Sequence, residues 1–192
     1  GLCYCGDPAA GEEWVAPLRQ MGPVVMDQVG VMPYPALQSM LDQVATPGHR
    51  YYLKSNFVDE LHDQAIDVLI DAYMRVPSPL TAVLLVQMGG AVSRANRAST
   101  AFYHRDAALS FSAFANWTDP AEDATNIAWT RQLWQDLGPY MPSGVYVNEL
   151  EDEGEERVRA AYGPAYDRLA ALKKKYDPAN LFRLNQNIKP AA

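Results

Sequence analysis

Two cysteines separated by a single residue are the first side chains of the chain that could do chemistry. Cys3 and Cys5 stand in residues 2–5, which we predict to be a short strand, so both thiols would lie on one face of it. That geometry is poor for a disulfide bond. A zinc ion needs further ligands, and the nearest histidine is His49. We therefore predict two ordinary thiols and no metal site.

A face of small polar side chains is the second feature that could do chemistry. Residues 109–117 alternate, with mainly apolar side chains at odd positions and a set that includes Ser110 and Ser112 at even positions. Such a face can line a substrate pocket or can be solvated, and the pattern leaves both interpretations open. Lys54, in a strand predicted over residues 50–56, could face the same pocket.

The strands and helices that would position these residues follow one another without strict alternation, which favours an α+β fold. The predicted strands cover residues 2–5, 50–56, 81–88, 99–105, 109–117 and 144–150. The predicted helices cover residues 8–20, 35–44, 58–74, 119–137, 155–162 and 164–176. Residues 81–88 are apolar on both faces, so we expect a central strand that is covered on both sides.

Composition and charge narrow the possible functions. The chain has 192 residues, of which 48% are hydrophobic, so it can bury a core. Its net charge is −7, and its densest basic run, Lys173–Lys175, is typical of a solvated helix face, so we expect no nucleic-acid partner. No apolar run is long enough to span a bilayer, and the start has no signal-peptide pattern. We expect a cytoplasmic protein and, because the sequence opens without Met, a fragment of a longer one.

The C-terminal part of the chain carries the most specific pattern. It reads Val145-Tyr146-Val147-Asn148, then Ala161-Tyr162-Gly163, then Lys175-Tyr176-Asp177-Pro178. In order and spacing this series resembles the C-terminal signature of the berberine bridge enzyme-like oxidases. Residues 100–105, Thr-Ala-Phe-Tyr-His-Arg, resemble a strand of the same family, and Trp117 resembles the tryptophan that follows it. The resemblance covers nearly the whole chain.

The tail can also be interpreted without any relative. Asp177 is a good capping residue for a turn after the last predicted helix. Tyr176 and Phe182 flank that turn, and we expect both aromatic rings to pin it to the core.

The resemblance implies a two-domain flavoprotein in which an N-terminal domain holds most of the FAD. The C-terminal domain would be an antiparallel sheet with helices on one face, while the other face covers the flavin. Residues 1–143 would then be a substrate-binding cap domain, incomplete at its N-terminus, and residues 144–192 the segment that returns to the flavin domain. The chain has no Gly-rich phosphate-binding stretch, since Gly89-Gly90 is too short a signal. We therefore expect FAD to be bound by a missing domain and to be absent from the purified chain.

The resemblance also implies site residues. Tyr146 and Asn148 match a strand that lies beside the flavin in relatives. The next position is commonly a tyrosine that acts as the catalytic base, but here it is Glu149. A partly buried carboxylate could replace that base. Glu149 could equally be the first residue of a solvated acidic run, residues 149–153, and both interpretations stay open.

Two further positions follow from the same resemblance. Some relatives carry an acid on the strand before the conserved tryptophan, and counting back from Trp117 puts that position at Ser110, whose hydroxyl is not a strong base. His104 is the remaining titratable candidate, although a structural histidine is the alternative. Asn185 and Gln186 lie where the tail of relatives meets the flavin domain. The resemblance therefore implies that these two residues help to bind the cofactor.

These observations predict the C-terminal part of an FAD-dependent oxidoreductase. The whole protein would oxidise an alcohol, an amine or an activated C–H of a small organic substrate by hydride transfer to flavin. The alternative is a non-catalytic remnant of a substrate domain that binds a ligand or a partner. We expect the chain's partners to be a small-molecule substrate and the missing FAD domain, with no membrane. An exposed domain face would promote self-association.

Overall fold

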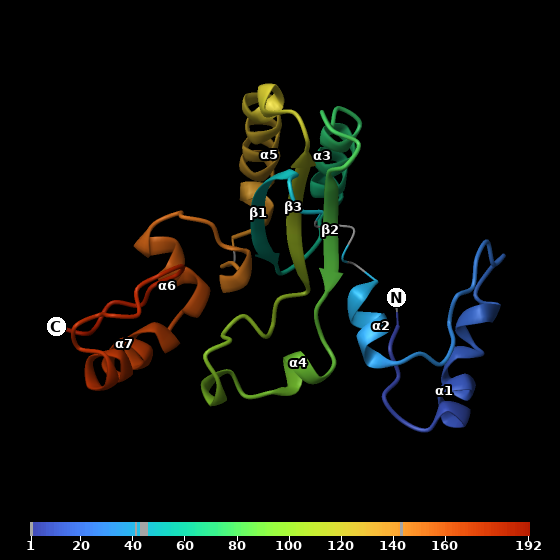
Figure 1. Cartoon of the computed structure of the whole chain (residues 1–192), viewed down its shortest axis with the longest axis horizontal. Coiled ribbons are helices and arrows are strands. Elements are labelled where there is room, and N and C mark those ends of the chain that lie inside the picture. The colour runs from blue at the N-terminus through green and yellow to red at the C-terminus, as the bar shows by residue number, and fades with distance from the viewer. Residues whose placement is uncertain (1, 41, 43–45, 143) are drawn as a thin grey trace. The chain divides into compact units, whose positions relative to one another are not determined.

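The computed structural model describes residues 2–40, 42, 46–142 and 144–192, and it divides into two compact units, Gly1–Pro47 and Gly48–Ala192 (Figure 1). The first unit holds two short helices, α1 (Pro8–Val15) and α2 (Tyr34–Ser39). The side chain of Asp7 caps α1 by accepting a hydrogen bond from the Ala9 N–H at 2.8 Å.

The two cysteines lie in extended chain before α1, not in the strand predicted for residues 2–5. The Sγ atoms of Cys3 and Cys5 are 3.7 Å apart, and both thiols are free and exposed. The prediction of two ordinary thiols without a metal site stays a prediction. The helix predicted over residues 35–44 ends at Ser39 in α2, and residues 41 and 43–45 lie outside the described residues.

A three-stranded antiparallel sheet forms the centre of the second unit. Its strands are β1 (Arg50–Val58), β2 (Ala82–Gln87) and β3 (Leu109–Trp117), in the order β1-β3-β2. The register places Ser55 of β1 opposite Ser112 of β3. Residues directly opposite each other in an antiparallel pair point to the same face, so this register decides which side chains meet.

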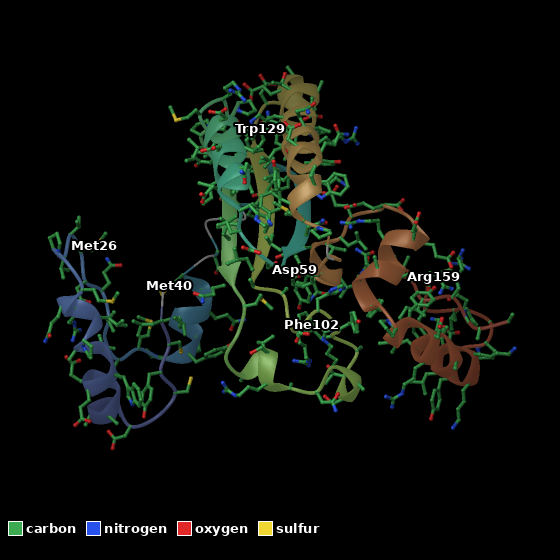
Figure 2. All side chains as sticks on the ribbon, turned by 180° about the vertical axis from the view of Figure 1, so that it is seen from behind. Met26, Met40, Asp59, Phe102, Trp129 and Arg159 are labelled. Atoms are coloured by element: carbon green, nitrogen blue, oxygen red, sulfur yellow. The ribbon has the colours of Figure 1, made fainter. Side chains whose placement is uncertain are left out.

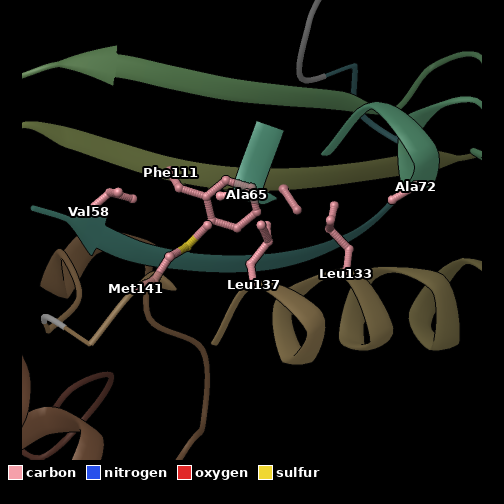
Figure 3. Packing of buried hydrophobic residues seen from close by; sticks show 8 residues of the cluster. Val58, Ala65, Ala72, Phe111, Leu133, Leu137 and Met141 are labelled. Carbon is pink, nitrogen blue, oxygen red and sulfur yellow. The ribbon is translucent and has the colours of Figure 1, made fainter. Parts of the chain in front are cut away.

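Helices α3 (Asp63–Tyr73) and α5 (Asp123–Leu137) cover one face of the sheet. Phe111 of β3 packs there with Leu133 and Leu137 of α5, as Figure 3 shows. The Trp129 indole N–H donates to the Ala72 carbonyl at 3.1 Å and so ties α5 to α3 (Figure 2). The predicted α+β fold with helices on one face of an antiparallel sheet is confirmed. In the part of the chain that the structure describes, no helix is long and apolar enough to cross a membrane.

The start of α5 follows from its sequence. Asp119 accepts a hydrogen bond from the Ala121 N–H at 2.9 Å, and Pro120 opens a 3-10 turn that continues into the helix. The predicted start of α3 was wrong, because Val58 is the buried last residue of β1 and the helix begins only after His62.

Strand β2 is at the edge of the sheet, so the prediction of a central strand over residues 81–88 was wrong. Leu84, Leu85 and Val86 are all exposed, and Val86 keeps 53% of its accessible surface. Residues 82–86 are all apolar, as the prediction assumed, but within the described residues only β3 pairs with this strand.

Residues 99–105 form turns instead of the predicted strand. The Arg105 guanidinium donates to the Val92 carbonyl at 2.9 Å and to the Thr100 hydroxyl at 2.7 Å. Asn96 caps a 3-10 turn at Arg97–Ser99. These side-chain hydrogen bonds to nearby groups compete with a β ladder, which explains the irregular backbone. A short helix, α4 (Ala91–Arg94), precedes this segment.

The C-terminal part contains α6 (Glu155–Tyr162) and α7 (Ala165–Tyr176), both close to prediction. Gly163 ends α6 with φ 52°, a left-handed conformation that favours glycine, and it faces the Tyr103 ring. A second apolar cluster holds these helices together. Its buried members are Val145, Leu150, Val158, Ala161, Tyr166 and Ala170.

The predicted strand over residues 144–150 is instead an extended stretch that ends in a 3-10 turn at Val147–Glu149. The Phe57 N–H of β1 donates to the Gly144 carbonyl at 2.7 Å, so the stretch begins as a neighbour of β1. The stretch then leaves β1, because the Glu149 N–H donates to the Tyr146 carbonyl at 2.9 Å within the 3-10 turn. The Asn148 side-chain amide donates to the Tyr146 hydroxyl at 2.7 Å.

The expected cap in the tail is present, but the expected aromatic anchors are not. Asp177 accepts hydrogen bonds from the Leu181 N–H at 2.7 Å and the Phe182 N–H at 3.0 Å. Tyr176 and Phe182 are 74% and 78% exposed, so the prediction that they pin the turn to the core was wrong. Lys173 takes over that role by donating to the Phe182 carbonyl and pairing with Asp177 at 2.5 Å.

Candidate functional site

The sheet has a face that the helices do not cover, and it carries the serines of β1 and β3. We call this the serine face and define it by Ser55, Ser110 and Ser112. Phe57 shares it, because Phe57 lies opposite Ser110 in the ladder. All of these residues are buried, which means that other parts of the second unit lie over this end of the face.

Glu149 places its carboxylate on the serine face. Its Oε2 atom accepts hydrogen bonds from the Ser55 hydroxyl at 2.6 Å and from the Ser112 hydroxyl at 2.7 Å. Both distances are within the normal range for a hydroxyl group that donates to a carboxylate oxygen. The Glu149 residue is half-buried. The interpretation of Glu149 as part of a solvated acidic run was therefore wrong. In the structure the Glu149 carboxylate lies against the sheet.

Two aromatic rings link the serine face to the segment that contains Glu149. Phe102 packs edge-on against Phe57 with 5.9 Å between ring centroids, and Tyr146 packs edge-on against Phe102 at 6.0 Å. Tyr146 is half-buried, whereas Asn148 is exposed beside it. The resemblance implied that Tyr146 and Asn148 lie on a strand beside a flavin; here Asn148 is in a 3-10 turn, and the contact with a flavin stays a prediction.

His104 occupies a separate place beside the serine face. Its ring stacks on Phe57 with 4.9 Å between centroids, and its Nε2–H donates to the Ala160 carbonyl at 2.8 Å. Burial lowers the pKa of His104, although the bond to Ala160 acts in the opposite direction. The ring therefore favours its neutral form. It lines a pocket of about 530 Å³ with Asp59 and Arg157, and Glu149 is not among the residues of that pocket.

Lys54 lies on the opposite face of the sheet from Ser110 and Ser112. Its Nζ is 2.9 Å from the Glu153 carboxylate and 5.6 Å from the centre of the Trp134 ring. The expectation that Lys54 and the two serines would share one pocket was wrong. The reason is the pleat, since side chains at consecutive positions of β1 point to opposite faces.

Asn185 and Gln186 are close to the C-terminal segment but not on the serine face. The Gln186 side-chain amide donates to the Leu150 carbonyl, which lies one residue after Glu149. Asn185 is exposed and adopts a left-handed backbone with φ 56°. Whether either residue contacts a cofactor stays a prediction.

Known proteins are similar in sequence to much of this chain. The family model "Berberine and berberine like" matches residues 145–189. An FAD-linked oxidoreductase of Dictyostelium discoideum is 31% identical over 190 residues, which are 97% of this chain and 41% of that protein. An uncharacterised FAD-linked oxidoreductase of Bacillus subtilis is 34% identical over 136 residues, 70% of this chain and 30% of that protein. The chain belongs to the berberine bridge enzyme-like family of FAD-linked oxidoreductases.

Solved structures of berberine bridge enzyme-like proteins have the same fold. A berberine bridge enzyme-like protein of Physcomitrella patens is 26% identical, with a TM-score of 0.68 over 80% of this chain and 33% of that one. A chitooligosaccharide oxidase gives a TM-score of 0.72 over 98% of this chain and 45% of that one, at 23% identity, which shows the fold alone. The chain spans 41% of the length of the Dictyostelium relative and 30% of the length of the Bacillus relative.

The serine face differs in chemical character from one side to the other. Near β1 it carries the Glu149 carboxylate. Near β2 it carries exposed apolar side chains, Leu84 and Val86. Polar and apolar groups therefore stand side by side on one surface.

Ser55 is the site residue that the sequence did not reveal. It contacts Glu149 only because β1 and β3 pair in a register that sets it opposite Ser112. The available signal was weak, since Ser55 alternates with Lys54 and Asn56, which turn to the helix side. In the described part of the chain, no group of three or more His, Cys, Asp or Glu residues could hold a metal ion.

Proposed function

We propose that this chain is the substrate-side part of an FAD-dependent oxidoreductase whose flavin is held mainly by another part of the polypeptide. The reaction would be oxidation of an alcohol, an amine or an activated C–H of a small organic molecule. The observation that carries the proposal is the Glu149 carboxylate, which two serines hold on the sheet face that α3 and α5 leave uncovered. The family membership supports the cofactor, since relatives are FAD-linked oxidoreductases.

The chain's own residues would do three things. Glu149 would accept the proton that leaves the substrate, because an ionised carboxylate within hydrogen-bond reach of the reacting group can act as a general base. The Tyr146 and Asn148 side chains, joined by a 2.7 Å hydrogen bond, would border the ring of the cofactor. Burial by the segment around Phe102 would exclude water from one side of the site. The bound FAD would supply the acceptor of the substrate's hydride.

His104 is the weaker candidate for the base. Its Nε2–H is committed to the Ala160 carbonyl, and its ring is stacked on Phe57. Both contacts favour a structural role in which the histidine fixes residues 102–105 against the sheet.

A sugar hydroxyl is the substrate that we propose to test first. Relatives with similar structures include a chitooligosaccharide oxidase and a glycopeptide hexose oxidase. One relative by sequence, from Streptomyces galilaeus, is an aclacinomycin-N/aclacinomycin-A oxidase, 29% identical over 126 residues. We propose that the substrate of this protein is likewise a hydroxyl group of a carbohydrate.

We also propose the division of labour along the chain. Residues 1–143 would form the substrate-binding part, and residues 144–192 would connect it to the flavin domain. The flavin domain would thus be the principal partner. A cytoplasmic location and independence from membranes and nucleic acids are part of the same proposal.

The test uses a chimaera in which this chain replaces the matched 41% of the Dictyostelium relative. We expect residues 1–192 alone to be colourless, and the purified chimaera to be yellow and to lose its flavin absorbance anaerobically when an oxidisable sugar is added. A chimaera that binds FAD but is reduced by no alcohol, amine or sugar would contradict the enzymatic proposal. It would favour the alternative of a non-catalytic ligand-binding remnant, which predicts binding without reduction.

A further inference from the structure

Two hydroxyl groups converge on one oxygen of Glu149, and no other described part of the chain holds that carboxylate. Its Oε2 accepts both hydrogen bonds, while its Oε1 has no hydrogen-bond partner within the described residues. We infer that Ser55 and Ser112 are positioning residues, which fix the Glu149 carboxylate so that Oε1 is presented to the substrate. The inference rests on the proposed function of Glu149 as the base.

The backbone around Glu149 cannot fix the carboxylate by itself. Glu149 ends a single 3-10 turn, in which its N–H donates to the Tyr146 carbonyl at 2.9 Å. A single 3-10 turn has poor hydrogen-bond geometry and leaves a glutamate side chain free to change rotamer. The orientation of the carboxylate must therefore come from groups outside the turn.

The sheet supplies those groups from its most rigid part. Ser55 and Ser112 are directly opposite each other in the β1–β3 ladder and are 0% and 5% exposed. Opposite residues of antiparallel strands have Cβ atoms roughly 5 Å apart, a spacing at which two hydroxyls can reach one oxygen between them. Groups on strands hold a catalytic side chain more accurately than groups on loops.

The arrangement also explains why both positions are serine. A buried hydroxyl without an acceptor costs about 1–3 kcal/mol, so each serine needs the Glu149 carboxylate as much as the carboxylate needs the serine. Alanine at either position would free the carboxylate, whereas threonine at position 112 would keep a hydroxyl at the same point of the strand. The two substitutions therefore separate the hydroxyl from the packing.

The test measures the motion of Glu149 in the full chain by ¹³C NMR relaxation. We expect a rigid Glu149 Cγ in the native chain, an order parameter below about 0.6 in Ser112→Ala, and recovery in Ser112→Thr. Ser78→Ala is the matched control, because Ser78 is also buried, at 4% exposure, and its hydroxyl oxygen accepts a hydrogen bond from the Leu80 N–H at 3.2 Å, away from Glu149. The inference would be overturned if the order parameter of the Glu149 Cγ were the same in the native chain and in Ser112→Ala. It would also be overturned if Ser78→Ala lowered this order parameter as much as Ser112→Ala does.

A second readout uses the flavin-loaded chimaera. Ser112→Ala is expected to slow flavin reduction about tenfold at saturating substrate, with KM unchanged and with the rate restored by Ser112→Thr. A change in KM alone would overturn the positioning role. If Glu149→Gln leaves reduction unaffected, the proposed function of Glu149 fails, while the relaxation data still decide whether the serines hold the side chain.

Discussion

Gly144 stands where the C-terminal segment passes closest to His104. A Cβ atom at this position would overlap the His104 imidazole and come within 2.7 Å of the Ala160 carbonyl oxygen. The backbone has little freedom to move away, since the Gly144 carbonyl accepts the 2.7 Å hydrogen bond from Phe57. A residue without a side chain is therefore needed for β1, His104 and α6 to meet.

Gly144→Ala is expected to lower the free energy of unfolding by about 1–3 kcal/mol, the usual range for overpacking. Gly138→Ala is the control, because nothing lies within 4 Å of a Cβ there and the backbone is helical, with φ −48° and ψ −43°. It should be neutral or stabilise by up to about 1 kcal/mol. Urea denaturation measures both, and equal effects would contradict the crowding at Gly144.

At the residue scale, the sequence predicted the parts of the site that lie close together in the chain. Tyr146, Asn148 and Glu149 follow from one motif, and the structure brings them together. The contact of Glu149 with Ser55 spans 94 positions and depends on strand register, which no local pattern encodes. The prediction for Lys54 was wrong for the same reason, since a shift of the strand register by one position moves a side chain to the opposite face of the sheet.

At the element scale, a buried ionic cluster fastens the C-terminal segment to β1. Glu153 pairs with Lys54 at 2.9 Å and with Arg157 at 3.1 Å, and its side chain is only 10% exposed. Arg157 also donates to the Asn56 side chain at 2.9 Å, and both cations lie against the Trp134 ring. The turn that carries Glu149 is thus held from its C-terminal side by charge.

Glu153→Gln would leave the Lys54 and Arg157 cations with a neutral partner at a site that is largely shielded from water. We expect it to lower the free energy of unfolding by about 3 kcal/mol, at the low end for breaking a buried ion pair. Glu156→Gln, at an exposed position of α6, should stay within about 0.5 kcal/mol of the native chain. Thermal or urea unfolding of both variants tests this, and a Glu153→Gln chain as stable as Glu156→Gln would show that the cluster does not fasten the segment.

Helices were predicted better than strands, for physical reasons. Caps and glycine stops are local, so the bounds of α6 and the start of α5 followed from Gly163 and Asp119. Residues 99–105 and 144–150 were predicted as strands, but Arg105 binds nearby groups in the first segment and the second ends in the 3-10 turn Val147–Glu149. Strand propensity shows that a segment can be extended, and it does not show that a partner strand is present.

At the scale of the whole molecule, the free edge of β2 is the most exposed part of the sheet. Leu84 and Val86 are 49% and 53% exposed on the serine-face side, and Ala82–Gln87 contains no charged residue and no proline. Edge strands usually carry such residues to prevent association. Beside it, β2 and α3 line an apolar groove of about 390 Å³ that includes Leu85 and Met74.

We propose that the isolated chain pairs with a second copy of itself through this edge. The weight-average mass in sedimentation equilibrium should then rise above 21.3 kDa with concentration. Val86→Lys should reduce association, because a charged side chain on the edge opposes pairing. Val25→Lys, at a 99% exposed position of the first unit, adds the same charge elsewhere and should associate like the native chain. A native chain that stays monomeric at high concentration would rule the pairing out.

In the proposed function, Glu149 acts on a substrate beside a flavin that another part of the polypeptide carries. The most direct measurement is the rate of anaerobic flavin reduction in the chimaera, for Glu149→Gln against Glu156→Gln, at equal flavin content. We expect Glu149→Gln to be slower by a factor of roughly 10²–10⁴, the usual contribution of a general base, and Glu156→Gln to match the unmodified chimaera. Reduction of Glu149→Gln at the unmodified rate would contradict the account.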